Sequence, residues 1–271
     1  MALRQAQGPR IWGPCTSTSS ATASKGPRRR PLMFIEIPYQ RRYEDFRKDG
    51  KMRLGAILKV FEAAGSRHSD TVGDNILTDT KEGKAWIMTD WFVEIDQFPM
   101  VNQEIKARTW VEPIKQILFS NRNFEIEADG KVCVRCVGRY VVVDLSTNRP
   151  QKIGPEFADQ YKPEDRQAIA MEKPPRLVTP EAFSNEVAIT VRRSDIDYND
   201  HVHNLTYLDY AFEALPHEVY KNYDFKKFRI SYKQAVKPHE QLVCKYACVE
   251  GKHVCCIFDK AGELKTQIEF E

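Results

Sequence analysis

The chain has 271 residues, enough for one large domain or two ordinary ones, and its hydrophobic content of 42% suits a globular protein. It contains no stretch of about 18 consecutive apolar residues, so we expect no transmembrane helix. The formal net charge of +3 comes from residues 1–32, which carry basic side chains and no acid. The rest of the chain is slightly acidic and gives no reason to expect nucleic-acid binding.

Residues 1–32 are rich in Ser, Thr, Pro and Arg and show no hydrophobic periodicity, so we expect a disordered basic leader. Two interpretations of this leader are open. Its composition matches that of an organellar transit peptide. Alternatively, Met33 is the true start and the leader is a dispensable or mistranslated extension, which is the interpretation we favour.

The first expected structural unit spans residues 33–145. The alternating run FIEIPYQ predicts a strand, and Leu54, Ile57, Leu58 and Phe61 then follow at helical spacing. Four β-rich runs come next, joined by turn sequences such as DG: AWIMTDWFVEID, QEIKARTWVEP, LFSNRNFEIEAD and KVCVRCVGRYVVVDL. One helix followed by about four antiparallel strands predicts a helix wrapped by a curled sheet.

The last of these runs contains a CxxC pair, Cys133 and Cys136. No second pair and no His follow at zinc spacing, so we expect both thiols to pack in the core and expect no metal there.

A proline-rich connector is expected at residues 146–184, and a second unit at residues 185–271. The second unit repeats the pattern of the first: a short run NEVAITV, apolar residues at helical spacing from Leu205 to Leu215, and Pro216 to limit the helix. The strand-like runs FRISYKQAV, QLVCKYACVE, HVCCIFDKA and LKTQIEFE follow.

The two units align at an offset of 151 residues, which places Phe212-Glu213-Ala214 on Phe61-Glu62-Ala63 and Leu205 on Leu54. The repeat predicts an α+β fold in which two helix-wrapped antiparallel sheets form one pseudo-dimeric body.

Polar residues gather just before the second helix, in RRSDIDYNDHVHN. Asp197, Asn199 and His201 are spaced i, i+2, i+4, so their side chains would point to one side of an extended segment. They also precede a helix start, where the first N–H groups lack partners. At an offset of 151 they align with Phe46, Lys48 and Gly50, which predicts one catalytic half and one supporting half.

These residue types suit hydrolysis of an activated acyl group. A His can move protons near neutral pH, an Asn can hold a water or a carbonyl oxygen, and a carboxylate can orient the His, polarise water or attack directly. Other interpretations stay open, because DYND is also turn chemistry and Asp200 or Asn204 could simply cap the helix. A metal site from Asp197, His201 and His203 is disfavoured, since the chain offers no complementary ligand cluster.

The segment RRSDIDYNDHVHNLTYLDYAFEALP resembles the acyl-ACP thioesterase family of plants and bacteria, and AWIMTDWFVEIDQFP followed by TWVEP resembles that family's first-half strands. The resemblance covers about residues 34–271. It implies a tandem (double) hotdog fold, a fatty acyl chain in a hydrophobic tunnel, and release of free fatty acid from an acyl carrier protein without a cofactor. It also implies Asp197, Asn199 and His201 as the catalytic residues.

Three positions depart from the family pattern. His203 stands where the family has the first Asn of HVNN, Tyr210 replaces a Trp, and Ala235 stands where some members carry a catalytic Glu. An acyl-CoA thioesterase and a non-enzymatic acyl-binding protein therefore remain alternatives. We expect a monomer or a homodimer, in the cytoplasm, or in a plastid if residues 1–32 are a transit peptide. A basic group of Lys226, Lys227 and Arg229 could meet an acidic carrier, although a solvated surface cluster is favoured.

Overall fold

The structure is a computed structural model that describes residues 34–74, 81, 83–147, 149–154, 157, 159–171 and 173–271. The expected leader of residues 1–32, and Met33, lie outside the described residues. Among the helices that are described, none combines the length and the apolar composition needed to cross a membrane.

The first half follows the predicted order of one helix and then four strands. Its elements are β1 (Ile35–Pro38), the 3-10 helix η1 (Tyr43–Asp45), α1 (Leu54–Val72), β2 (Lys84–Ile95), β3 (Ile105–Val111), β4 (Ser120–Ala128), β5 (Lys131–Asp144) and a short β6 (Arg149–Gln151). The second half repeats this order with β7 (Asn185–Thr190), η2 (Arg193–Asp195), α4 (Thr206–Ala214), α5 (His217–Asn222), β8 (Lys227–Tyr232), β9 (Gln241–Val249), β10 (Lys252–Asp259) and β11 (Leu264–Phe270).

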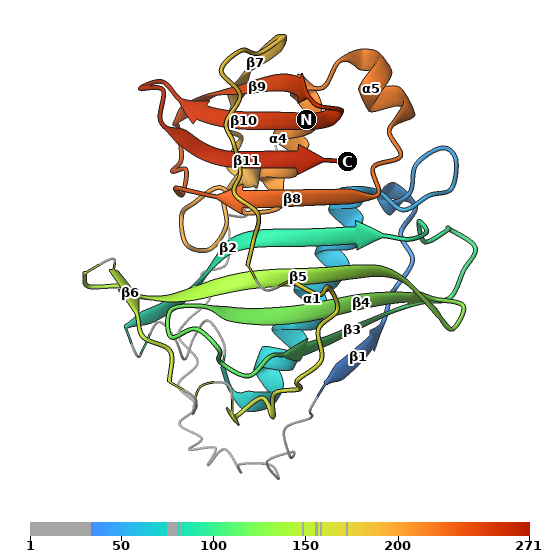
Figure 1. Cartoon of the computed structure of the whole chain (residues 1–271), viewed down its shortest axis with the longest axis vertical. Coiled ribbons are helices and arrows are strands. Elements are labelled where there is room, and N and C mark those ends of the chain that lie inside the picture. Colours follow the sequence, from blue (N-terminus) through green and yellow to red (C-terminus); the bar gives the residue numbers. More distant parts are fainter. Residues whose placement is uncertain are drawn as a thin grey trace, which may run out of the picture. The chain divides into compact units, whose positions relative to one another are not determined.

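The strands of both halves join in one antiparallel sheet, in the order β1-β3-β4-β5-β2-β8-β11-β10-β9-β7, with β6 paired to β5 (Figure 1). The junction is the pairing of β2 with β8, where Asp90 lies opposite Ser231 and Glu94 opposite Lys227. The predicted α+β architecture of two helix-wrapped antiparallel sheets is confirmed, and the structure adds that the two sheets meet edge to edge.

The sheet has one face on the helices and one face away from them. Trp91 of β2 lies opposite Gly138 of β5 and stacks on Phe61 of α1, with ring centroids 6.4 Å apart. The neighbouring pair, Asp90 and Arg139, points to the other face because side chains alternate along a strand.

The predicted helix faces are buried. Leu54, Ile57, Leu58 and Phe61 are fully shielded from solvent, as expected from their spacing. In the second half, Pro216 follows the end of α4, as predicted.

Equivalent features of the two halves lie 150 residues apart, so the offset of 151 is wrong by one residue. The clearest pairs are the 3-10 helices at 43–45 and 193–195, and the β-bridges Phe46–Met52 and Ile196–Val202. The matching Phe-Glu-Ala triplets that suggested 151 are not equivalent, because Phe61 is fully buried whereas Phe212 is only partly buried. The correct equivalents are Arg47 for Asp197, Asp49 for Asn199 and Lys51 for His201.

Candidate active site

The segment from Asp197 to His201 is a closed turn. The bridge between Ile196 and Val202 closes its base, and the N–H of Asp197 donates to the carbonyl oxygen of His201 at 2.8 Å. Oδ1 of Asp197 accepts from the N–H of Asn199 at 2.8 Å and from the N–H of His201 at 3.4 Å. The three residues therefore do not line one side of an extended segment, because the Asp197 carboxylate folds back onto the turn that it stabilises.

A buried carboxylate anchors the start of this turn. Asp195 is 3% exposed and accepts from the N–H of Arg192 at 2.8 Å, from the Arg192 guanidinium at 3.0 Å and from the hydroxyl of Tyr210 at 2.7 Å. Burial acts to raise the pKa of Asp195, but these three donors outweigh it and lower the pKa below its usual value. Tyr210, one of the departures from the family pattern, thus helps to hold the loop in place.

The far end of the turn is fixed by the chain that follows β8. The N–H of Val202 donates to the carbonyl of Val236 at 2.8 Å, and the N–H of Val236 donates to the hydroxyl of Tyr207 at 3.1 Å. Ala235 is exposed and precedes Val236 directly, so it lies beside the loop and brings no titratable group to it.

The helix that follows begins later than the sequence suggested. The N-cap of α4 is Leu205, with no hydrogen bond from a capping side chain, so neither Asp200 nor Asn204 caps it. Asp200 instead takes a left-handed conformation, with φ of 58°, in the turn itself.

The turn leaves reactive groups unengaged. Asn199 is exposed and His201 is partly exposed, and neither side chain has a hydrogen bond or an ion pair with the part of the chain that the structure describes. In the same described part, Oδ2 of Asp197 likewise has no partner. The loop therefore holds its own shape through backbone groups and one carboxylate oxygen, while an amide, an imidazole and a second carboxylate oxygen stay available.

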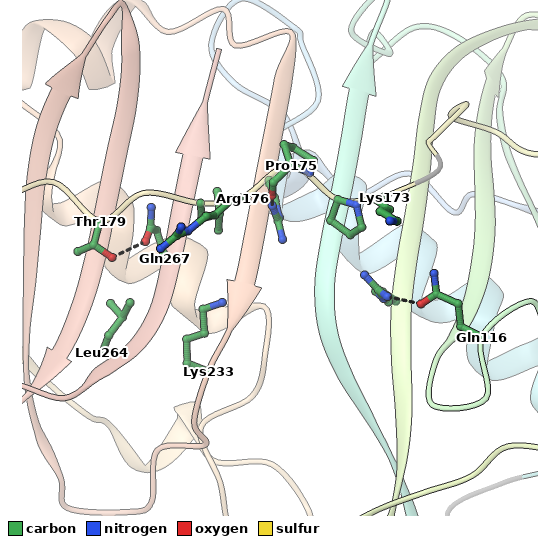
Figure 2. A pocket seen from close by; sticks show the side chains of 12 residues that line it. Gln116, Lys173, Pro175, Arg176, Thr179, Lys233, Leu264 and Gln267 are labelled. Carbon is green, nitrogen blue, oxygen red and sulfur yellow. Dashed lines mark hydrogen bonds between the residues drawn. The ribbon is translucent and has the colours of Figure 1, made fainter.

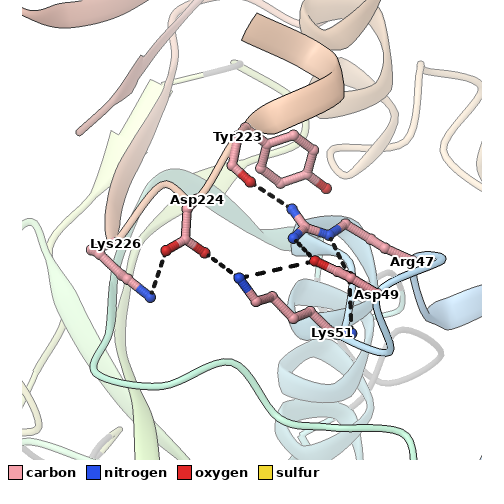
Figure 3. Close-up of polar contacts among 6 residues, drawn as sticks. All are labelled: Arg47, Asp49, Lys51, Tyr223, Asp224 and Lys226. Atoms are coloured by element: carbon pink, nitrogen blue, oxygen red, sulfur yellow. Dashed lines mark hydrogen bonds and ion pairs between the residues drawn. The ribbon is translucent and has the colours of Figure 1, made fainter.

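The equivalent loop of the first half uses its side chains differently, as Figure 3 shows. Arg47 donates to the carbonyl of Tyr223 at 2.7 Å and pairs with Asp49. Lys51 pairs with Asp224 at 2.8 Å. Here the residues equivalent to Asp197 and His201 are bound to the other half, so this loop serves as a structural contact.

A second histidine of the candidate loop makes a contact that the sequence did not reveal. Nε2 of His203 lies 3.0 Å from Oε1 of Glu62, which belongs to α1 of the first half. The hydrogen bond to Glu62 raises the pKa of His203 above its usual value, against the opposing effect of burial, and the charge of Asp197 contributes in the same direction. No local signal in the sequence could pair His203 with a residue so distant in the chain.

The predictions about metals and cavities have mixed outcomes. Cys133 and Cys136 are buried in the core, as expected, and burial raises the pKa of Cys133 to about 11. Among the described residues, no group of three or more His, Cys, Asp or Glu side chains gathers as metal ligands would. Neither described cavity corresponds to the predicted acyl tunnel at the candidate site. The two cavities described, of about 620 and 190 Å³, are lined by other residues than Asp197, Asn199 and His201, so the acyl tunnel stays a prediction.

The basic group of Lys226, Lys227 and Arg229 forms ion pairs within the fold. Lys226 pairs with Asp224 at 3.2 Å, Lys227 with Glu94 at 2.9 Å and Arg229 with Asp90 at 2.6 Å. Each of the three cations therefore has an acidic partner within the fold, and Asp224 is shared between Lys226 and Lys51.

Relatives of known activity match this chain in sequence. It is 27% identical over 199 residues to oleoyl-acyl carrier protein thioesterase 2, chloroplastic, of Arabidopsis thaliana, which covers 67% of this chain and 54% of the relative. It is 23% identical to a chloroplastic dodecanoyl-[acyl-carrier-protein] hydrolase of Cinnamomum camphora, over 69% of this chain and 52% of the relative. The chain thus spans about half the length of the curated relatives that it matches.

Solved structures confirm the fold. A 12:0-ACP thioesterase from Umbellularia californica superposes with a TM-score of 0.80 at 18% identity, over 89% of this chain and 97% of the other. An acyl-ACP thioesterase from Bacteroides thetaiotaomicron gives 0.78 at 21% identity, over 88% and 97%. The double hotdog fold implied by the sequence is therefore confirmed.

Family models give the final identification. Residues 34–161 match the acyl-ACP thioesterase N-terminal domain, and residues 179–269 match the acyl-ACP thioesterase C-terminal domain. Together the two matches take in most of the chain and both halves of the sheet, so this chain belongs to the acyl-ACP thioesterase family.

Proposed function

We propose that this protein hydrolyses the thioester of a fatty acyl group carried on acyl carrier protein, releasing a free fatty acid. The observation that carries the proposal is the contrast between two equivalent loops. In the first half the loop side chains are consumed in ion pairs, whereas in the second half Asn199 and His201 have no partner among the described residues. Membership of the family supplies the class of substrate.

In the proposed reaction, His201 takes a proton from a water molecule as the water oxygen attacks the thioester carbonyl carbon. The side-chain amide of Asn199 donates to the carbonyl oxygen as it gains negative charge. The intermediate then collapses, the C–S bond breaks, and the leaving thiolate receives the proton from His201. The products are a carboxylic acid and a thiol, and no cofactor is required.

Asp197 has two roles in this proposal, one structural and one electrostatic. Oδ1 accepts from two backbone N–H groups and keeps the turn closed, while the charge and Oδ2 act on the water and on the imidazolium that forms. Attack on the thioester by Asp197 itself, with a covalent acyl intermediate, is the alternative route.

The test is hydrolysis of a ladder of acyl-ACPs and acyl-CoAs by the purified protein, with free fatty acid and free thiol both measured. We expect His201→Ala to lower kcat by roughly 10²–10⁴. Lys51→Ala, at the equivalent position of the first half, is the matched control and should keep its turnover. Near-normal turnover by His201→Ala would contradict the mechanism.

The same assay separates the alternatives. Release from CoA but not from the carrier protein would make the chain an acyl-CoA thioesterase. Saturable acyl binding without release would favour a non-enzymatic acyl-binding protein. This alternative is kept because Ala235 has no carboxyl group where some family members carry a catalytic Glu.

The place of action is also a proposal. The plant relatives are named as chloroplastic, which favours a plastid over the cytoplasm if residues 1–32 act as a transit peptide. A monomer or a homodimer is expected, because β2 and β8 already pair the two halves within one chain.

A further inference from the structure

A cavity of about 620 Å³ lies on the face of the sheet that points away from α1 and α4. The segment from Lys173 to Thr179 passes over the strands and forms its outer wall (Figure 2). Cavities that hold small ligands have volumes of roughly 300–1,000 Å³, so this one is large enough for a small molecule. None of the residues proposed for catalysis lines it.

The walls of the cavity are strongly cationic. Among the residues that the structure describes, five basic side chains and no carboxylate line it: Arg139, Lys173, Arg176, Arg229 and Lys233. They come from β5 of the first half, from β8 and the chain after it in the second half, and from the crossing segment between them. All three parts of the fold therefore contribute charge to the same space.

Only one of these cations is neutralised by the fold. Arg229 pairs with Asp90 at 2.6 Å and donates to the carbonyl of Pro175, which ties the crossing segment to β8. Gln267, another lining residue, donates to Oε1 of Glu269 at 3.5 Å. Within the part of the chain that the structure describes, the other four basic side chains have no carboxylate partner.

Arg139 shows that the charge is incompletely compensated. Its Nη2 donates to Oε1 of Gln116 at 2.9 Å, and its guanidinium lies 3.8 Å from the centre of the Phe119 ring. Its Nε is buried and has no acceptor among the described residues. Burial is the largest effect and lowers the pKa of Arg139; the charge of Asp90 acts to raise it and that of Arg229 to lower it. A partly buried guanidinium with one buried, unused donor is a group that an anion would stabilise.

The chemistry of the lining selects the kind of anion. Guanidinium groups bind phosphate through paired N–H donors, and Gln267 and Thr179 add polar groups at the same wall. No aromatic ring among the described residues lines the cavity, so this lining offers no surface on which a nucleobase would stack. We propose that this cavity binds a small multivalent anion that carries phosphate groups, held chiefly by Arg139, Arg176 and Lys233.

Such an anion would join the crossing segment to both halves of the sheet. The crossing segment is already held at its far end, where Thr179 donates to Gln267 at 3.0 Å and Gln267 donates to the carbonyl of Val178 at 3.0 Å. A ligand that binds only the folded arrangement raises the apparent stability by mass action. Binding should therefore raise Tm in a saturable way.

The test uses pyrophosphate as the probe, at an ionic strength of about 0.15 M so that exposed charges are screened. Isothermal titration calorimetry and thermal unfolding are recorded for the full chain, for the Arg176→Gln/Lys233→Gln double variant, and for Lys260→Gln. Lys260 is exposed and does not line the cavity, so it is the matched control. We expect saturable binding and a higher Tm for the full chain and the control, and at least a tenfold weaker affinity for the double variant.

A second arm identifies the source of the phosphate. The protein is sedimented with phosphatidylglycerol vesicles and with phosphatidylcholine vesicles. Pyrophosphate binding without sedimentation assigns a free phosphate compound, whereas sedimentation with phosphatidylglycerol that the double variant loses assigns a lipid headgroup. The proposal is overturned if neither probe binds, or if the double variant binds as tightly as the full chain.

Discussion

His203 and Glu62 join the two halves of the molecule at the candidate loop. Nε2 of His203 lies 3.0 Å from Oε1 of Glu62, and the two residues come from different hotdog units. The pair forms an ion pair when the imidazole is protonated, and its hydrogen bond raises the pKa of His203. Lys59 acts in the opposite direction and Asp197 in the same one, so the charge on the loop depends on both halves.

This pair should make stability depend on pH. Because the pKa of His203 is raised on folding, the stabilisation is fully present below the unfolded value of about 6.5 and is lost as pH rises through the folded value. We expect Glu62→Gln to lower the free energy of unfolding by roughly 0.2–1 kcal/mol at pH 5.5, and by less at pH 8.5, since both side chains are partly exposed.

Urea unfolding at the two pH values measures this difference. Glu213→Gln is the control, because Glu213 is an exposed helix residue without an ion pair among the described residues. An equal effect of Glu62→Gln at both pH values would show that the pair does not titrate as described.

The two parts proposed for Asp197 can be separated by two substitutions. Asp197→Asn keeps an oxygen that can accept from the N–H groups of Asn199 and His201, but it removes the charge. Asp197→Ala removes both. We expect both variants to lose thioesterase turnover by roughly 10²-fold or more, but only Asp197→Ala to lose Tm as well. The readouts are kcat with acyl-ACP and thermal unfolding of each variant. Full turnover by Asp197→Asn would show that the role of the carboxylate is structural and that its charge is not needed for the reaction.

Asp195 should be a stability determinant and not a reacting group. Asp195→Ala leaves the N–H of Arg192 and the buried hydroxyl of Tyr210 without their acceptor, which costs roughly 1–3 kcal/mol. Since the pKa of Asp195 is lowered on folding, its contribution is present above about pH 4 and is lost as pH falls. Chemical unfolding at pH 7 and at pH 3 checks both statements. Tyr210→Phe removes a single donor and should cost only about 1 kcal/mol; a cost equal to that of Asp195→Ala would contradict this account.

The fold was predictable from the sequence because its signals are local. Helical spacing identified the buried residues of α1, and alternation identified the strands of both halves. The offset of the repeat was wrong by one residue because Phe212-Glu213-Ala214 resembles Phe61-Glu62-Ala63 by chance. The identity of these three residues favoured the offset of 151, whereas the turns closed by the Phe46–Met52 and Ile196–Val202 bridges give the offset of 150.

The candidate site was predictable only in part. Residue types and spacing pointed to Asp197, Asn199 and His201, but the contact of His203 with Glu62 depends on the docking of the two halves, which no local pattern encodes. The edge-to-edge pairing of β2 with β8 and the crossing of the connector over the sheet have the same origin. Contacts between distant segments depend on how those segments pack together, and no single stretch of sequence determines that packing.

Arg47 and Asp197 occupy equivalent positions in the two halves, but we expect substitution of Arg47 to lower stability and substitution of Asp197 to lower turnover. Arg47 donates to the carbonyl of Tyr223 at 2.7 Å, and its guanidinium lies 4.5 Å from the centre of that ring. Arg47→Ala loses this hydrogen bond, the ion pair with Asp49 and this cation–π contact, so we expect the free energy of unfolding to fall by roughly 1–3 kcal/mol. Turnover of the folded variant should stay near normal, because this loop bears structural contacts only.

Guanidinium chloride unfolding and acyl-ACP hydrolysis are measured on the same preparations of Arg47→Ala, Asp197→Asn and Lys48→Ala. Lys48 is exposed in the same loop and is the control for removal of a surface charge. Stability should fall in Arg47→Ala alone and turnover in Asp197→Asn alone. If Arg47→Ala loses turnover while it keeps its stability, the first-half loop takes part in the reaction, and the division of the molecule into a catalytic half and a supporting half is wrong.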